Sequence, residues 1–67
     1  MEYSKEELAE AKRQIDSTLH KLRETVRTLE RKENPARYRS QITLAKRRIS
    51  AFALAVSLVE KELERIP

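Results

Sequence analysis

The sequence predicts an all-α protein, an antiparallel hairpin of two helices spanning about 4–33 and 35–66. Two observations carry this prediction. Apolar residues recur at alternating spacings of four and three in both halves of the chain, and the one interior proline directly follows Asn34. The 67 residues suit a single domain, 1–67. A chain this short gains little net stability from its own core, which favours assembly into a larger bundle.

The first helix has a clear signal at its start. Ser4 suits the N-cap position and Glu7 follows three residues later, which is the capping-box pattern, and Tyr3 and Leu8 occupy the positions of a hydrophobic staple. Lys12 interrupts the apolar stripe that follows, and we expect its ammonium group to reach outward to water. The stripe consists of Leu8, Ala11, Ile15, Leu19, Leu22, Val26 and Leu29.

The connection is predicted at Asn34-Pro35. A residue before proline is disfavoured in helical angles, proline suits the first position of a helix, and Asn34 is a good N-cap. The first helix should therefore end near Lys32 or Glu33, and the second should begin at Pro35. The second stripe repeats with a period near 3.5, which predicts left-handed coiled-coil packing. Its members are Tyr38, Ile42, Ala45, Ile49, Phe52, Val56, Val59, Leu63 and Ile66.

The second helix carries a second apolar face, centred roughly 130° from its stripe. One neighbouring helix cannot cover both faces. We predict that this second face is an oligomer interface, with a twofold-symmetric homodimer forming a four-helix bundle as the favoured assembly. Two alternatives stay open: scattered surface leucines on a monomer, or a groove for a helix of a different protein. The predicted interface residues are Leu44, Ala51, Leu54, Ala55 and Leu58.

Positive charge is concentrated around the predicted turn. Residues 20–48 carry ten Lys or Arg against three Glu, whereas 1–19 carry three against five acids and 49–67 carry two against three. Such a cluster can contact the phosphates of RNA or DNA, or an acidic protein partner, although most charged helix faces are simply solvated. The candidate contacts are Arg27, Arg31, Arg37, Arg39, Lys46, Arg47 and Arg48.

The residues of catalytic and metal sites are scarce. The chain has no cysteine and no glycine, which excludes thiolate sites and glycine-rich phosphate loops. His20 is the only histidine, and we expect it to form a solvated surface pair with Asp16 one turn earlier. Thr18 and Thr25 border the first stripe and should pack there. We therefore expect no enzyme activity, no cofactor, no metal ion and no small-molecule substrate.

The predicted arrangement resembles that of the Rop type of protein, a helical hairpin that dimerises into a four-helix bundle and binds RNA. The likeness is one of architecture, so no residue role is carried over from it. The first residues of the chain are polar and acidic, unlike a signal peptide, and the longest nearly apolar run covers only 51–59. Nine residues cannot cross a bilayer that needs about 20. We expect a soluble, cytoplasmic protein that acts as an interaction module or as a nucleic-acid-binding regulator.

Overall fold

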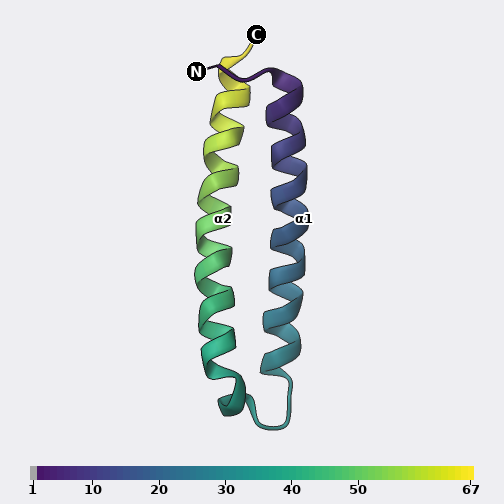
Figure 1. Ribbon diagram of the computed structural model, residues 1–67, viewed down its shortest axis with the longest axis vertical. Coiled ribbons are helices and arrows are strands. Elements are labelled where there is room, and N and C mark those ends of the chain that lie inside the picture. Colours follow the sequence, from purple (N-terminus) through teal and green to yellow (C-terminus); the bar gives the residue numbers. More distant parts are fainter. Residues whose placement is uncertain (1) are drawn as a thin grey trace.

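The computed structural model describes residues 2–67. Within that range the chain forms two α-helices and no strands: α1 (Lys5–Glu30), a short 3₁₀ turn η1 (Pro35–Tyr38) and α2 (Arg39–Arg65). The helices lie side by side and run in opposite directions, with the turn at one end and both chain ends at the other (Figure 1). The predicted all-α helical hairpin is thereby confirmed.

The start of α1 is fixed by the predicted capping box. The Ser4 hydroxyl oxygen accepts the Glu7 N–H at 3.1 Å, and the Glu7 carboxylate accepts the Ser4 N–H at 3.0 Å. Because the carboxylate accepts these hydrogen bonds, the pKa of Glu7 lies below its ordinary value of 4.5. The staple is less complete, since Leu8 is buried but Tyr3 is 54% exposed.

The connection differs from the prediction in three respects. α1 ends at Glu30 rather than near Glu33, α2 begins at Arg39 rather than at Pro35, and Asn34 makes no side-chain capping hydrogen bond. The physical reason is that tighter 3₁₀ hydrogen bonds reverse the chain within a short span. The 3₁₀ turn η1 begins with a hydrogen bond to the backbone of Asn34 and not to its side chain: the Asn34 carbonyl oxygen accepts the Arg37 N–H at 3.1 Å.

The core is a single layer between the two helices. Its buried side chains all belong to the two predicted stripes: Leu8, Leu19 and Val26 from α1, and Ala45 and Val56 from α2. Leu19 is the least exposed of them at 4%, and none of the described side chains is fully shielded from solvent. At the turn end, the Lys32 ammonium group lies 6.0 Å from the centre of the half-buried Tyr38 ring. The stripes have therefore paired as predicted, around a thin core.

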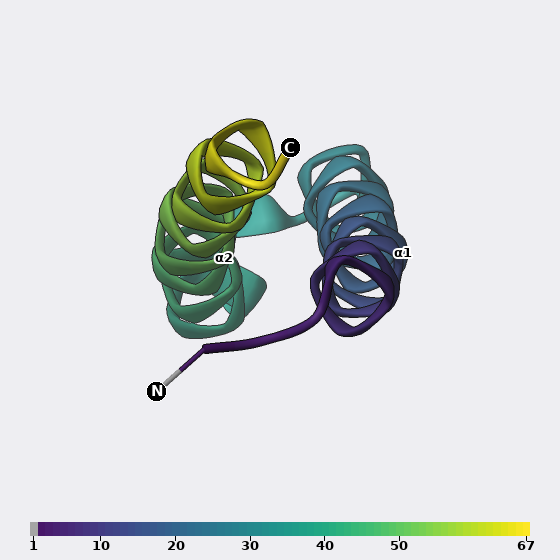
Figure 2. The same ribbon diagram turned by 90° about the horizontal axis from the view of Figure 1, so that it is seen from above.

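The overall shape is a rod two helices thick. The molecule measures 50 × 15 × 15 Å, and each helix has a helical neighbour on one side only (Figure 2). Its radius of gyration is 15.2 Å, against about 11 Å expected for a compact domain of this length. It exposes 5593 Å², whereas a compact protein of this mass exposes about 4,400 Å². The lone hairpin thus leaves an excess of surface in contact with water.

Candidate interaction surface

Among residues 2–67, the large aliphatic side chains that stay exposed belong to one face of α2. Leu44 is 48% exposed, Leu54 63% and Leu58 59%. Ala51 lies among them and is exposed, while Ala55 is half-buried because it lies closer to the stripe that faces α1. These five residues, named here the outer apolar face, span about 21 Å along the helix. All five predicted interface residues thus stay at least partly open in the single chain.

Covering the outer apolar face is energetically favourable. Full burial of one leucine side chain contributes about 1.5–3 kcal/mol relative to full exposure. Three half-exposed or more exposed leucines on one helix, in a chain with so thin a core, therefore represent a large unused part of its apolar surface. Within residues 2–67 the three leucines of this face stay exposed, because α1 packs against the stripe of α2 that lies about 130° away around the helix.

The seven candidate basic contacts are all exposed, but they do not form one surface. Two of them are held in ion pairs: Arg27 lies 2.8 Å from Glu24 on α1, and Lys46 lies 3.1 Å from Glu30 across the two helices. At 100° per residue, Arg47 lies within the outer apolar face, between the directions of Leu54 and Leu58, and Arg48 lies at its edge beside Ala55. The remaining members are divided between the turn region and the other sides of α2. They are Arg31, Arg37 and Arg39.

Arg39 and Lys46 line a shallow groove near the turn together with Glu30 and Ile42. The carboxylate of Glu30 gives this groove mixed charge, which is a poor match for a chain of phosphates. The ion pair between Glu30 and Lys46 was not predictable from residue spacing, because pairing across the helices depends on the register that the turn sets. This local arrangement separates two of the basic candidates from those beside the outer apolar face.

Lys12 is held between the two helices rather than reaching freely into water. Its ammonium nitrogen lies 3.1 Å from a carboxylate oxygen of Asp16 and 4.0 Å from one of Glu60 on α2. The hydrogen bond with Asp16, and then the attraction of that carboxylate, raise the pKa of Lys12 above its ordinary value of 10.5. Asp16 is paired with this lysine, and the expected pair with His20 is absent from residues 2–67.

Two threonines of α1 are satisfied within their own helix. Thr18 donates its hydroxyl hydrogen to the Gln14 carbonyl oxygen at 3.1 Å, and Thr25 donates to the Lys21 carbonyl oxygen at 2.9 Å. Both threonines are exposed, so the predicted packing beside the stripe is wrong for the single chain. Because each hydroxyl is bonded to the carbonyl oxygen four residues earlier, only the methyl group of the side chain remains available for contacts with other groups.

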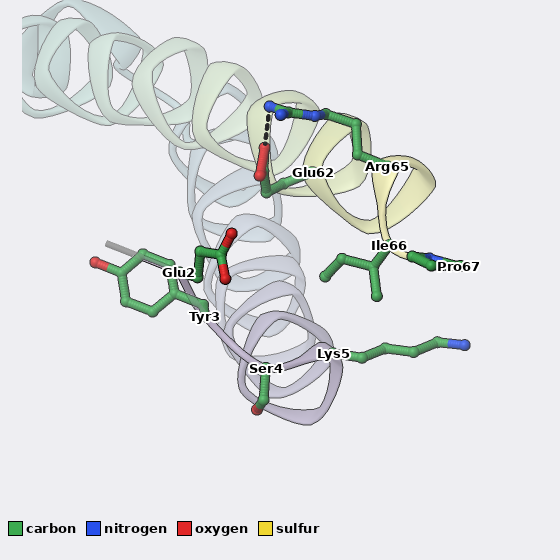
Figure 3. A pocket seen from close by; sticks show the side chains of 8 residues that line it. All are labelled: Glu2, Tyr3, Ser4, Lys5, Glu62, Arg65, Ile66 and Pro67. Atoms are coloured by element: carbon green, nitrogen blue, oxygen red, sulfur yellow. Dashed lines mark hydrogen bonds and ion pairs between the residues drawn. The ribbon is translucent and has the colours of Figure 1, made fainter.

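A shallow depression lies at the end of the rod that carries both chain ends (Figure 3). Figure 3 shows Tyr3 pointing away from Ile66, and Arg65 paired with Glu62 at 3.1 Å. The sequence pattern did not reveal this depression, which follows from both chain ends meeting at one end of the hairpin. The lining residues are Glu2, Tyr3, Ser4, Lys5, Glu62, Arg65, Ile66 and Pro67.

Metal and membrane features were searched over the same residues. Across the described chain, no three His, Cys, Asp or Glu side chains lie close enough together to hold a metal ion. Neither α1 nor α2 has the length and apolar character needed to cross a bilayer. Among the described residues, the outer apolar face, with its three exposed leucines, is the candidate interaction surface.

Comparison of the chain with models of known protein families, with curated proteins and with solved structures gives no match. The outer apolar face and the charges around it are the features of the molecule that point to a function.

Proposed function

We propose that this chain is a small, non-enzymatic structural or interaction module that self-associates through the outer apolar face of α2. Two hairpins would then form a four-helix bundle with twofold symmetry. The observation that carries this proposal is the exposure of Leu44, Leu54 and Leu58 on one helix whose opposite face already contacts α1.

The area available to a second copy supports a homodimer as the occupant of this face. Each separate chain exposes 5593 Å². A compact protein of twice the mass would expose about 7,300 Å², so compact pairing would bury about 3,900 Å² in total. Stable interfaces need only about 1,200–2,000 Å². A pair of hairpins that buried half of this area would still reach the size of a stable interface.

A second copy also fits the shape of the face. In a twofold interface the same patch is used by both subunits, so an apolar face meets an apolar face. Ala51 and Ala55 are small, which lets two helices approach closely at the middle of α2. The leucines on either side would then fill the space between the helices.

The mass of the chain in solution tests this proposal. By sedimentation equilibrium at tens of micromolar, we expect twice the chain mass of 7.9 kDa. The thermal midpoint should also rise with protein concentration, because association stabilises only the folded state. A mass of 7.9 kDa with a concentration-independent midpoint would rule out self-association.

A matched pair of variants locates the interface. Leu54→Gln combined with Leu58→Gln keeps the net charge and the helix propensity but removes apolar surface from the outer apolar face. We expect this variant to sediment as a helical monomer. Ser17→Gln combined with Thr28→Gln also introduces two glutamines, but on the exposed outer side of α1, and should remain dimeric. If the first pair unfolds, Leu44→Gln offers a milder change at the same face, and an unaltered dimer in either case would place the interface elsewhere.

Nucleic-acid binding by the basic turn end is the second candidate function. The feature in its favour is the excess of positive charge in 20–48, where five of the seven candidate contacts make no ion pair within the described chain. A phosphate-binding protein loses affinity steeply as salt rises. Fluorescence anisotropy with a labelled 20-base-pair DNA duplex and an RNA hairpin, at 50 and 200 mM salt, tests this. No binding to either probe at 50 mM would remove the candidate.

A further inference from the structure

The two ends of the rod differ in charge. The half nearest the turn, residues 20–48, has a formal net charge of +7, and the half nearest the chain ends, 1–19 and 49–67, has one of −3. Because the hairpin is 50 Å long, these halves are well separated in space (Figure 1). Two such rods attract when they lie head to tail and repel when they lie with like ends together.

The outer apolar face is centred on the helix that carries it. Leu44 and Leu58 each lie seven residues from Ala51, and Ala51 is one residue from the middle of α2. When α2 packs against a second α2 with the two Ala51 residues at the same height, the two outer apolar faces overlap along their whole length. The two rods also overlap fully, whether the helices are parallel or antiparallel. Apolar burial alone does not choose between a parallel and an antiparallel pair of hairpins.

The charges beside the outer apolar face make that choice. Arg47 lies within the face and Arg48 at its edge, and both are exposed and make no ion pair within 2–67. In a parallel pair each would lie at the same height as its own copy, so four guanidinium groups would meet at one level. In an antiparallel pair about Ala51 they lie at the height of the partner's Ala55 and the partner's Leu54, where their aliphatic stems can cover apolar surface.

We infer that two copies dock with α2 antiparallel to the partner's α2 about a twofold axis near Ala51, so that each basic turn end lies beside the partner's acidic open end. This inference rests on the proposed self-association and adds its orientation. At physiological salt, charges act over about 8 Å. The discrimination therefore comes mainly from Arg47, Arg48 and the charged groups that border the interface.

The salt dependence of the dimer has opposite signs for the two orientations. An antiparallel dimer should dissociate more readily as salt rises from 50 to 500 mM, because screening weakens the attraction between unlike ends. Its dissociation constant should also rise in the Arg47→Gln and Arg48→Gln double variant at low salt. A parallel dimer would become tighter under both changes, and that result would overturn the inference.

Pulsed dipolar spectroscopy measures the orientation directly. The natural chain has no cysteine, so Glu33→Cys at the turn or Lys5→Cys at the open end gives one spin label per chain. We expect both labelled dimers to show separations close to the 50 Å length of the rod. Separations of about 20–24 Å, two helix diameters, for both labels would show parallel pairing and overturn the inference while keeping the dimer. Absence of dipolar coupling together with a mass of 7.9 kDa would instead refute self-association itself.

Discussion

The two helices are nearly equal in length, 26 and 27 residues, yet their outward sides differ. α1 is covered by charged and polar groups, and three of its ion pairs join residues one turn apart within the helix. α2 has one such pair, between Arg65 and Glu62, and carries its exposed leucines instead. Hairpin formation therefore covers the apolar side of α1 but leaves α2 with an apolar side still open to water.

The largest effect is expected from comparing the two apolar sides of the hairpin. Leu19→Ala removes the most buried side chain and should cost about 2–5 kcal/mol of unfolding free energy at every protein concentration. Leu58→Ala should destabilise the chain only at concentrations where it self-associates. Thermal unfolding followed by circular dichroism at 1 and 100 µM separates the two. An equal, concentration-independent loss for both variants would mean that Leu58 is already covered within one chain.

A smaller effect is expected at the helix starts. Ser4→Ala breaks the capping box of α1 and should lower stability by about 1 kcal/mol. Asn34→Ala serves as the matched control, because Asn34 makes no side-chain capping hydrogen bond and its loss should be close to neutral. Chemical unfolding of both variants checks this. A larger loss for Asn34 than for Ser4 would show that the turn, rather than the α1 start, holds the capping interaction.

The pH dependence of stability should differ between two groups of α1. Glu7 has a lowered pKa, so its contribution is present above pH 4.5 and is lost as the pH falls through its folded value. Lys12 has a raised pKa, so its contribution is present below pH 10.5 and is lost as the pH rises through its folded value. Relative to the wild type, Glu7→Gln should therefore be less stable at pH 7 and equal in stability in strong acid. Lys12→Met should differ in stability from the wild type at pH 7, and this difference should disappear only in strong alkali. Thermal midpoints of both variants across pH 2–12 test the two opposite pH dependences.

The smallest effect is expected for the ion pair between Glu30 and Lys46 at the turn end. Both side chains are about half exposed, so the pair should contribute no more than about 0–1 kcal/mol and should weaken with salt. A double-mutant cycle with Glu30→Gln and Lys46→Gln measures its coupling energy. A value well above 1 kcal/mol would mean that this pair is shielded from water, as it would be beneath a second chain.

Much of the fold was predictable because it depends on local periodicity. The stripe of each helix determines which side faces inward, and Ser4 with Glu7 marks the start of α1 in the sequence itself. The turn was predicted less well. Proline at position 35 suits a 3₁₀ turn as well as an α-helix, and the choice depends on how far the chain must travel to bring α2 against α1. The spacing of residues in the sequence does not reveal the distance that the chain must span between the two helices.

The outer apolar face could also be predicted, since the angular position of each leucine follows from its number. The contacts of Lys12 and Lys46 could not. Both lysines reach carboxylates on the other helix, and such pairing depends on the register between helices and on the reach of flexible side chains. The spread of the basic residues of α2 over several sides of the rod follows from their numbers in the same way as the positions of the leucines.

The hydroxyl groups of Thr18 and Thr25 affect how much it costs to remove water from one edge of α1. Each already has its hydrogen-bond acceptor one turn earlier in the same helix. An apolar helix packed along that edge would therefore leave no hydroxyl donor without an acceptor. The free-energy cost of removing these polar side chains from water would then be small. The two residues are seven positions apart, which is two helical turns, so they lie on the same side of α1. Their methyl groups form a strip that can face either water or a neighbouring helix.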